Sequence, residues 1–528
     1  MNPSSQHRAH VYKGRAISGV KWTTASTALS TGFYLVQTVV LARLLEPRDF
    51  GLMAMAVVVI SIAMAYADMG LSSAIVQRQH CSENELSSLY WLNILAGILV
   101  FSVIFALSPV IAYFFHEPRV TRMVQLCALT FVIAPIGQQY QLLLQKELHF
   151  RPLAIIEVAG RGSGTAVAIG LALAGAGVYS LVFGQLATSA ASSLLLMLRG
   201  HRIYRPHLHF AWADVRSYMR FGLYQMGERA INTLHDNLDK IIIGAWLHAE
   251  VLGFYNFAWN LATLPINRIN PIITRTAFPL FSRLQEDGAL LSRGYFKLLR
   301  LLSIVNFPLF LGLCGVSSLA VPIIFGEKWI PAVPLIQIFC LFAVGYSIGN
   351  PVGSLVLAKG RADLGFWWNV VVSAIQAVAI ALSAWRSGVM GVAWTLLVLQ
   401  VLYFPASYYF LVRPVLGRCW RQYVASVAPA LIASLVMLGT LKVALFLFPA
   451  LAHASCWGLA LMISLGCIVY FLAGFALFRG EIRELVALAL RRERKGAEQQ
   501  ENYLSPALGP NGTIVFASAG VPELPDAK

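Results

Sequence analysis

Apolar runs of about 20 residues recur along nearly the whole chain, and each is long enough to cross the hydrocarbon core of a bilayer as a helix. Of the 528 residues, 58% are hydrophobic and only 12% are charged. Soluble domains carry about 25% charged residues, which keep them dissolved. The sequence therefore predicts an all-α, polytopic membrane protein.

We predict about fourteen transmembrane helices joined by short connections. They cover approximately residues 18–44, 50–70, 87–114, 121–144, 153–175, 178–198, 217–246, 251–282, 295–320, 332–358, 363–384, 389–411, 422–447 and 455–478. The first run is too long and too polar for the apolar part of a cleavable signal peptide, so we expect it to remain as the first span. Ser82 followed by Glu85 predicts a capping box that opens the third span.

The distribution of basic residues between the loops tests this predicted membrane topology. With the N-terminus inside, the cytoplasmic segments carry 26 Lys and Arg residues. The outer loops and the span ends that border them carry six: Arg43, Arg48, Arg119, Arg122, Lys328 and Arg386. Such a bias is typical of inner loops, so both termini are predicted to be cytoplasmic. The basic residues behind the net charge of +16 are thus expected to orient the spans in the membrane, next to its lipids. They form no basic patch with interleaved aromatic residues, so no nucleic-acid partner is predicted.

A weak internal repeat relates spans 1–6 to spans 7–12. The matches are Leu45 and Gly51 with Leu247 and Gly253, residues 115–117 with 325–327, and Cys127, Gly137 and Lys146 with Cys340, Gly349 and Lys359. Duplication of this kind is typical of transporters that bind substrate between two halves. The predicted domains are an N-terminal lobe over 1–210, a C-terminal lobe over 211–415, two additional spans over 416–480, and a tail over 481–528 that is first basic and then disordered.

Enzymatic and metal chemistry are not expected. The seven cysteines lie far apart, mostly inside apolar segments, where buried and unpaired side chains are expected. No cysteine or histidine spacing predicts a metal site or a disulfide framework. No loop between spans exceeds about twenty residues, so there is no room for a soluble catalytic domain.

Charged residues inside the membrane are concentrated in spans 7 and 8. Span 7 carries both signs and span 8 carries two arginines: Arg220, Glu228, Arg229, His235, Asp236, Asp239 and Lys240, then Arg268 and Arg275. A charge at mid-bilayer costs at least ~2.5–3.5 kcal/mol, so these groups must face a partner or a watery cavity.

The arginines predict a substrate site. At about 1.5 Å per residue, Arg275, Arg229 and Arg268 lie on the order of 12, 18 and 22 Å from the cytoplasmic ends of their helices. If the two helices are neighbours, these residues form a cationic ladder. Arg161 in span 5 adds a fourth cation unless it is neutralised by Glu157, one turn before it. Planar, permanently charged guanidinium groups suit a diphosphate. Bends at Pro265 and Pro271 would free backbone carbonyls beside such a cavity.

The same charges have structural interpretations. Glu228, Asp236 and Asp239 could form ion pairs with the arginines, and Asp236 can pair with Lys240 one turn away. The acidic residues are also candidates for coupling to H⁺ or Na⁺, as is Asp68 near the inner end of span 2, although that side chain can reach the interface instead. No other cofactor is predicted. The glycines around Arg161 (Gly160, Gly162 and Gly164) predict close helix packing rather than a phosphate loop.

Several stretches resemble a known family. Residues 41–52, LARLLEPRDFGL, are similar to the first outer loop of the Wzx-type polysaccharide flippases, members of the multidrug/oligosaccharidyl-lipid/polysaccharide (MOP) exporter superfamily. Further stretches resemble the colanic acid exporter branch of this family. They are 90–93 (YWLN), 137–140 (GQQY), 145–150 (QKELHF), 203–210 (IYRPHLHF), 270–275 (NPIITR), 306–308 (NFP), 325–329 (FGEKW) and 349–354 (GNPVGS). The resemblance runs through spans 1–12 in order and fades in the last two spans and the tail.

This resemblance implies two six-helix lobes in a V with two extra C-terminal helices. It implies that lipid-linked oligosaccharide units on undecaprenyl diphosphate are flipped across the bacterial inner membrane for exopolysaccharide or lipopolysaccharide biosynthesis. Alternating access, often driven by a cation gradient, and cooperation with a polysaccharide polymerase and export machinery are further implications. Arg275 falls within one of the matching motifs, whereas the assignment of Arg229 and Arg268 to the site depends on their spacing in the helices.

Two other functions compete with flipping. A multidrug or cation antiporter of the same superfamily would favour an acid-lined cavity. The mid-membrane charges of spans 7 and 8 are instead five basic residues (Arg220, Arg229, Lys240, Arg268 and Arg275) against three acidic ones (Glu228, Asp236 and Asp239). A membrane glycan polymerase or ligase would need a large outer loop, and the predicted outer loops are short.

Overall fold

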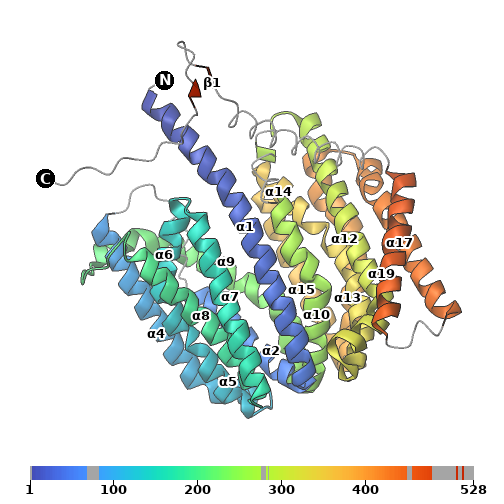
Figure 1. The fold of residues 1–528 in the computed structure, drawn as a ribbon, viewed down its shortest axis with the longest axis horizontal. Helices are drawn as coiled ribbons and strands as arrows, with labels where there is room; N and C mark the ends of the chain where they lie inside the picture. Colours follow the sequence, from blue (N-terminus) through green and yellow to red (C-terminus); the bar gives the residue numbers. More distant parts are fainter. Residues whose placement is uncertain are drawn as a thin grey trace.

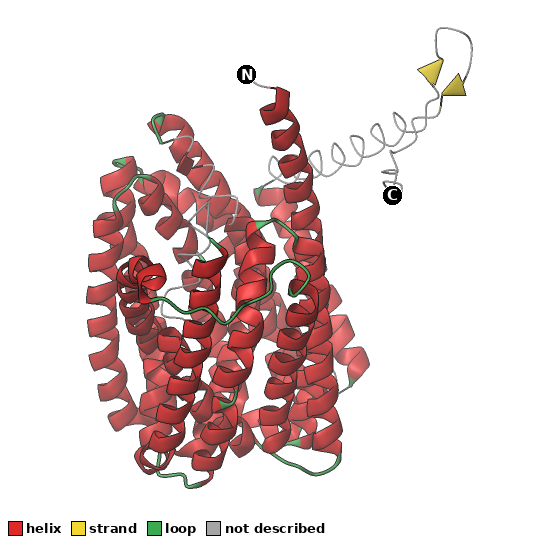
Figure 2. Cartoon of the chain, turned by 90° about the vertical axis from the view of Figure 1, so that its left-hand side faces the viewer, coloured by secondary structure: helices red, strands yellow, loops and turns green. Residues whose placement is uncertain are grey.

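The computed structural model describes residues 3–67, 82–274, 281–282, 285–448, 455–478, 507–508 and 514–515. Its long helices run roughly parallel to one another, and most of the loops gather at the two ends of the bundle (Figure 2). Helices satisfy their own backbone hydrogen bonds, which a lipid environment requires.

The first half of the chain forms the N-terminal lobe. Its described helices are α1 (Pro3–Leu44), α2 (Pro47–Ala67), α4 (Glu83–Phe114), α5 (Arg119–Ala128), α6 (Thr130–Lys146), α7 (Phe150–Leu173) and α8 (Tyr179–Gly200). The predicted capping box opens α4, because Ser82 Oγ accepts from Glu85 N at 3.2 Å and Glu85 Oε2 accepts from Ser82 N at 3.0 Å. That prediction is confirmed.

The second half forms the C-terminal lobe, shown green to orange beside the blue and teal first lobe in Figure 1. Its helices are α9 (Trp212–Trp246), α10 (His248–Thr274), α12 (Gly288–Phe325), the 3₁₀ turn η1 (Glu327–Ala332), α13 (Val333–Tyr346), α14 (Gly349–Ala358) and α15 (Ala362–Ser407). The π-turn η2 (Tyr408–Val412) and α16 (Arg413–Leu416) lead to α17 (Trp420–Leu447) and α19 (Cys456–Leu477), which pack on the outside of α12. A two-residue strand pair, β1 (Ala507–Leu508) and β2 (Ile514–Val515), lies in the tail.

The chain is a multi-pass membrane protein, and the predicted fourteen helices are confirmed. Eleven of the described segments are long and apolar enough to cross a membrane. One of them, 363–416, contains two predicted spans, because non-helical backbone at Gly388 (φ 60°, ψ −153°) separates them. Helices α9 and α10 complete the set, although their polar residues make them less apolar than the rest. The domain boundaries at 210, 415 and 480 stay predictions.

The internal repeat is also seen in the backbone, where turns and helix breaks recur at equivalent positions of the two halves. The turn after α4 and the turn after α12 both place their central residue at positive φ, His116 at 55° and Gly326 at 101°. Further along, Gly175 at 81° and Gly388 at 60° occupy equivalent turns. The fourth span is broken into α5 and α6 and the tenth into α13 and α14. Equivalent breaks at equivalent positions indicate two structurally related six-helix halves.

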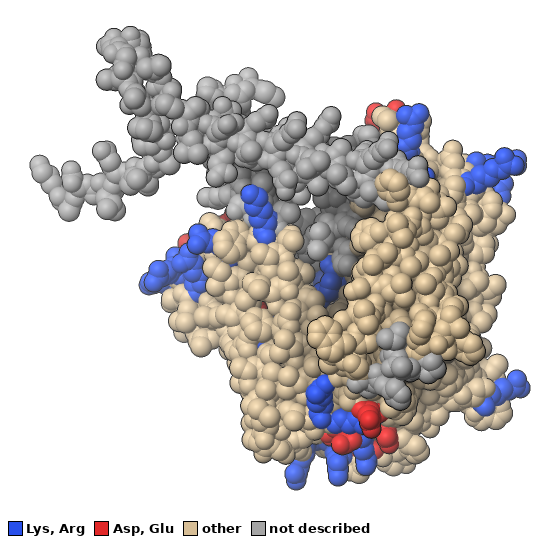
Figure 3. All heavy atoms as spheres, turned by 45° about the vertical axis from the view of Figure 1, so that its right-hand side comes forward, with Lys and Arg blue, Asp and Glu red and all other residues tan. Residues whose placement is uncertain are grey.

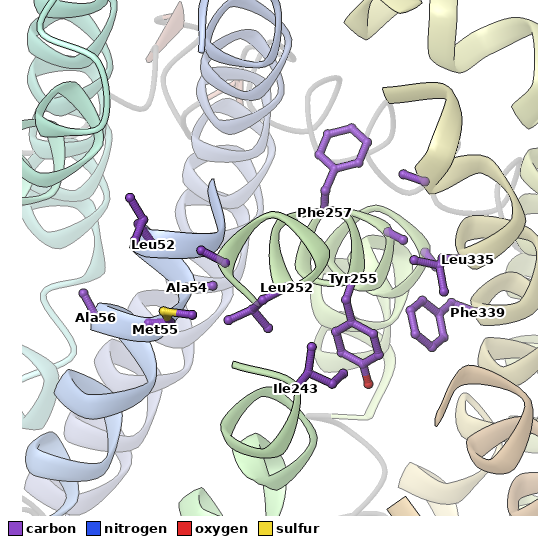
Figure 4. Close-up of a cluster of buried hydrophobic side chains, with 14 of the residues drawn as sticks. Leu52, Ala54, Met55, Ala56, Ile243, Leu252, Tyr255, Phe257, Leu335 and Phe339 are labelled. Carbon is purple, nitrogen blue, oxygen red and sulfur yellow. The ribbon is translucent and has the colours of Figure 1, made fainter. Parts of the chain in front are cut away.

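A buried core joins the lobes through α2. In Figure 4, Met55 of α2 lies near Leu252 of α10, and both belong with Leu52 of α2 and Ile243 of α9 to one buried cluster. These apolar side chains of α2 are therefore buried against protein from both lobes. Among the described cysteines four are buried, as expected, but Cys456 and Cys467 on α19 are exposed. For these two the prediction of burial is wrong, because α19 lies at the edge of the bundle.

The lobes touch most closely at one end of the bundle, which we call the closed end (residues 42–51, 247–253 and 323–329). A Cβ added to Gly51 would lie 1.6 Å from Ala249 O, and one added to Gly253 would lie 2.0 Å from Pro47 O. These contacts are reciprocal: the same two repeat positions meet from opposite lobes. Only glycine permits helices α2 and α10 to approach so closely.

Hydrogen bonds reinforce the closed end. Arg43 Nε donates to Ile324 O at 2.8 Å, and its Nη2 donates to the neighbouring carbonyl of Ile323. In the other direction, Lys328 Nζ donates to Arg43 O at 3.0 Å and Trp329 Nε1 donates to Ala42 O at 2.9 Å. Arg43 and Lys328, which the charge count assigned to different outer loops, therefore meet at one end of the molecule.

Candidate functional site

One face of α10 carries a polar stripe. Asn256, Asn260, Leu264 and Arg268 follow one another at intervals of four residues, and the helix continues through Pro265 to Thr274. Residues four apart lie one above the other on a helix, so these side chains share one face. The stripe runs from near the closed end, past the middle of α10, to within two turns of its last residue, Thr274.

This stripe borders a chamber of about 440 Å³ between the lobes. Helices α1, α2, α7 and α8 of the N-terminal lobe and α10 and α12 of the C-terminal lobe supply its lining. The residues are Tyr34, Leu35, Gln37, Thr38, Leu41, Phe50, Met53, Arg161, Leu181, Gly184, Gln185, Thr188, Ser189, Asn256, Phe257, Asn260, Leu261, Leu264 and Phe325. Figure 3 shows one face of the molecule hollowed between the lobes, with basic side chains (blue) visible inside the hollow.

The closed end forms one wall of the chamber. Phe50, Phe257 and Phe325 line it and pack among themselves, and the Phe257 ring also stacks on Trp329 with centroids 4.0 Å apart. Since Trp329 donates to Ala42 across the lobes, the same aromatic cluster seals the chamber and holds the closed end.

Close packing of α7 against α8 positions Arg161. A Cβ on Gly164 would lie 1.8 Å from Thr188 Oγ1, and one on Gly160 would lie 2.0 Å from Ser192 Oγ. The predicted role of these glycines in helix packing is therefore confirmed. Because α7 presents its glycine face to α8, Arg161 projects beside that contact into the chamber.

Arg161 and Arg268 come from opposite lobes and meet around Tyr34 of α1. The Arg268 guanidinium carbon lies 5.8 Å from the centre of the Tyr34 ring. Arg161 is close enough to interact electrostatically with Tyr34, with Arg268 and with Glu157. Glu157, one turn away on α7, accepts a hydrogen bond from Ser26 at 3.1 Å.

Neither guanidinium forms a close ion pair within the described part of the chain. Arg161 and Arg268 form no hydrogen bond and no salt bridge within 4 Å with any residue described there. Two adjacent positive charges with one carboxylate, Glu157, near them are costly in a membrane protein unless water or an anionic ligand compensates the remaining charge. The arrangement can therefore hold a multivalent anion between the lobes.

The rest of the lining mixes uncharged polar side chains with apolar ones. Gln37 is held by Thr165, whose Oγ1 donates to Gln37 Oε1 at 3.2 Å. The carboxamides of Gln185, Asn256 and Asn260 form no hydrogen bonds with described residues, so their donors and acceptors are available to a ligand or water.

The remaining residues of the predicted site lie on α9, outside this lining. Arg229 is exposed and has a polar interaction of its own. Asp239 is buried and accepts from Tyr255 Oη at 2.5 Å, whereas Asp236 is exposed. Lys240 donates from Nζ to Asn237 at 3.2 Å rather than forming a salt bridge with a described carboxylate.

Part of the predicted site cannot be placed. Arg275 and Asp68 lie outside the described residues, and the side chain of Glu228 is not described. The described residues contain no group of three or more His, Cys, Asp or Glu side chains that could hold a metal ion.

The uncharged lining residues were not predicted from the sequence. A usable signal was present on α10, where Asn256 and Asn260 continue the four-residue spacing of Arg268 in an otherwise apolar helix. No comparable spacing marks Tyr34, which contributes through its position between the two arginines.

Comparison with known proteins places this geometry in a family. A family model described as polysaccharide biosynthesis protein matches residues 40–334. The lipopolysaccharide biosynthesis protein WzxC of Escherichia coli (strain K12) is 38% identical over 412 residues, covering 78% of this chain and 84% of that protein. The teichuronic acid biosynthesis protein TuaB of Bacillus subtilis (strain 168) is 34% identical over 388 residues, covering 74% and 80%.

A solved structure shares the fold. The lipid II flippase MurJ, in an inward closed conformation, aligns with a TM-score of 0.69 at 13% identity, covering 88% of this chain and 100% of that chain. Identity at this level concerns the fold alone. Together, the family match and the relatives of more than 30% identity show that the chain belongs to the polysaccharide biosynthesis protein family, among the Wzx-type flippases of the MOP exporter superfamily.

Proposed function

We propose that the protein flips oligosaccharide repeat units linked to undecaprenyl diphosphate from the cytoplasmic to the outer leaflet of the bacterial inner membrane. The flipped units then serve exopolysaccharide or lipopolysaccharide biosynthesis, with a polysaccharide polymerase and export machinery as partners. The names of the relatives support this proposal, since they belong to lipopolysaccharide and teichuronic acid biosynthesis.

The observation that carries the proposal is the pair of adjacent arginines, whose two positive charges exceed the one nearby carboxylate, Glu157. Arg161 and Arg268 come from different lobes and face the same inter-lobe space beside Tyr34. A diphosphate has enough oxygens to accept hydrogen bonds from two guanidinium groups at once. A site shared by two lobes can release its ligand when the lobes move apart, which suits alternating access.

Sidedness follows from charge. We assign the closed end to the outer face, because it carries the basic residues of the sparsely charged loops, including Arg43 and Lys328. Both termini are then cytoplasmic. The structure thus corresponds to a state in which the outer exit is shut, and opening requires separation of Gly51 from the start of α10.

The multidrug or cation antiporter is disfavoured by the chamber. Its described lining contains one charged residue, Arg161, and no Asp or Glu. A cationic substrate would meet a positive charge without compensation at mid-membrane depth.

For energy coupling to H⁺ or Na⁺ we propose Asp239. It is buried, and it accepts hydrogen bonds from the neutral Tyr255 hydroxyl and from the backbone N–H of Lys240. Asp236, the neighbouring carboxylate on α9, interacts electrostatically with Asp239 and also with His235 and Lys240. Replacing Asp239 by Asn should abolish gradient-driven accumulation while equilibrating flipping continues, and equal loss of both would contradict a coupling role.

A flipping assay tests the site. Purified protein is reconstituted with an undecaprenyl-diphosphate-linked, galactose-terminated disaccharide, and external galactose oxidase measures how much sugar reaches the outside. A hydrogen bond to a charged group contributes about 1.5–3 kcal/mol, so Arg161→Ala and Arg268→Ala should each slow flipping by roughly 10- to 150-fold. Lysine at either position should rescue only partly, since it lacks the planar fork.

Arg122→Ala is the matched control, because Arg122 is exposed on α5 and lies outside the chamber lining. It should flip at the wild-type rate. Wild-type rates from both Arg161→Ala and Arg268→Ala would refute the assignment of the site.

A further inference from the structure

The segment that joins the two lobes, between the end of α8 and the start of α9, is held firmly on its inner side. We call this segment the inter-lobe linker (residues 201–211). The Tyr204 side chain is buried and its hydroxyl forms a hydrogen bond with Ser87 of α4. Further along, Trp91 Nε1 donates to His207 O at 3.0 Å. These contacts fix the linker against the first turns of α4.

The end of the linker is fixed in the same way. Ser88 Oγ of α4 donates to Asp214 Oδ2 at 2.9 Å and accepts from Ala211 N at 3.1 Å. His209 Nε2 lies 3.0 Å from the same carboxylate oxygen. Asp214 is the only acidic residue between positions 199 and 216, so the one carboxylate of this region is already bonded within the protein.

The outer side of this region is apolar and basic. Four bulky apolar side chains of the linker and the first residue of α9 are exposed: Ile203, Leu208, Phe210 and Trp212, with Leu208 92% exposed and Trp212 57% exposed. Three arginines are exposed among them in the sequence, and none forms a hydrogen bond or salt bridge with a described residue: Arg202, Arg205 and Arg216. Because the inner side of the linker is fixed, these side chains cannot turn inward.

The depth of the linker indicates what covers these side chains. Helix α4 has 32 residues, about 48 Å at 1.5 Å per residue, whereas the hydrocarbon core of a bilayer is about 30 Å thick. If α4 is centred in the core, about 9 Å of the helix projects beyond it at each end. The linker is bonded to Ser87, Ser88 and Trp91, which lie about 6–12 Å from the start of α4. That depth is the boundary between the acyl chains and the lipid headgroups.

The exposed side chains suit this boundary. Tryptophan and other bulky apolar residues partition into the membrane interface. Each arginine close to an anionic lipid surface strengthens its attraction by a factor of about five. We propose that the inter-lobe linker docks on the headgroups of anionic phospholipids, with the four apolar side chains in the interface and Arg202, Arg205 and Arg216 at lipid phosphates. The site is separate from the diphosphate site, since none of these residues lines the chamber.

Lipid-specific quenching tests the proposal. A single NBD fluorophore is attached at Leu208→Cys in the full-length protein with its native cysteines replaced. The protein is reconstituted in vesicles of phosphatidylcholine with a minor fraction of phosphatidylglycerol. A nitroxide, which quenches NBD at short range, is placed near the headgroup end of the acyl chain of one lipid or the other. Both lipids should quench the label, and phosphatidylglycerol should do so at least about fivefold more per molecule.

Variants of the arginines separate charge from structure. Changing Arg202, Arg205 and Arg216 together to Ala should remove the preference for phosphatidylglycerol, whereas changing them to Lys should keep it, because the attraction depends on charge. Arg293→Ala is the matched control and should keep the preference, since Arg293 is exposed near the start of α12 and lies outside the linker. A label at Glu286→Cys, in the exposed turn before α12, should be quenched by neither lipid.

Two results would overturn the proposal. Equal quenching of the label at position 208 by the two lipids would overturn the assignment of anionic headgroups. Quenching by neither lipid would overturn docking on the membrane and leave the exposed side chains to a protein partner. Neither result depends on undecaprenyl diphosphate, so the proposed diphosphate site is tested separately.

Discussion

Adding one methyl group at Gly51 should open the closed end. The new Cβ would lie 1.6 Å from Ala249 O, whereas an ordinary contact begins near 3.4 Å, so α2 and α10 must separate by up to about 2 Å. Overpacking of this kind costs about 1–3 kcal/mol. Since the clash exists only where the lobes touch, that cost falls on the closed-end state and should raise the population of the alternative state by about 5- to 150-fold.

Cysteine labelling measures this shift. In a background with the native cysteines replaced, Asn256→Cys places a thiol in the chamber, and a membrane-impermeant maleimide is added from the outer side. Gly51→Ala should raise the labelling rate by about 5- to 150-fold. Gly32→Ala, where an added Cβ meets nothing within 4 Å, should leave it unchanged. An unchanged rate in folded Gly51→Ala protein would refute the gating role of this contact.

Two further predictions concern the supporting contacts. Trp329→Phe keeps an aromatic ring but removes the 2.9 Å hydrogen bond to Ala42 O, so it should weaken the closed end by about 1 kcal/mol and raise outer labelling roughly fivefold. Asn306→Ala removes the 2.7 Å bond from Asn306 Nδ2 to Asn270 Oδ1 in the C-terminal lobe. It should destabilise the protein by about 1–3 kcal/mol in thermal unfolding, whereas Asn369→Ala, at an exposed position, should have no such effect.

Much of the fold could be predicted because span length and loop charge are local properties. The repeat predicted that Gly51 and Gly253 occupy equivalent positions in the two lobes. Their direct contact could not be predicted, because it depends on the position of the axis that relates the two lobes. Cys456 and Cys467 show the corresponding limit: an apolar span predicts insertion into the bilayer, and only packing decides which of its faces meets protein.

The candidate site was predicted in part. Arg161 and Arg268 were identified because charge is rare in apolar helices, and the structure brings them together around Tyr34. Asn256 and Asn260 were not predicted, because placing a neutral carboxamide in a membrane helix costs less free energy than placing a charge there. An asparagine in a span is therefore a weaker indication of a site. A substrate-binding role for Arg229 stays a prediction, since sequence spacing does not give the rotation of α9 relative to α10.

A double-mutant cycle on diphosphate binding tests the central claim most directly. The affinity of the reconstituted protein for undecaprenyl diphosphate is measured for the wild type, Arg161→Ala, Arg268→Ala and the double variant. Both arginines are proposed to hold one diphosphate, so each single change should weaken binding by roughly 10- to 150-fold and the two effects should not add. Undiminished affinity in the double variant would contradict the account.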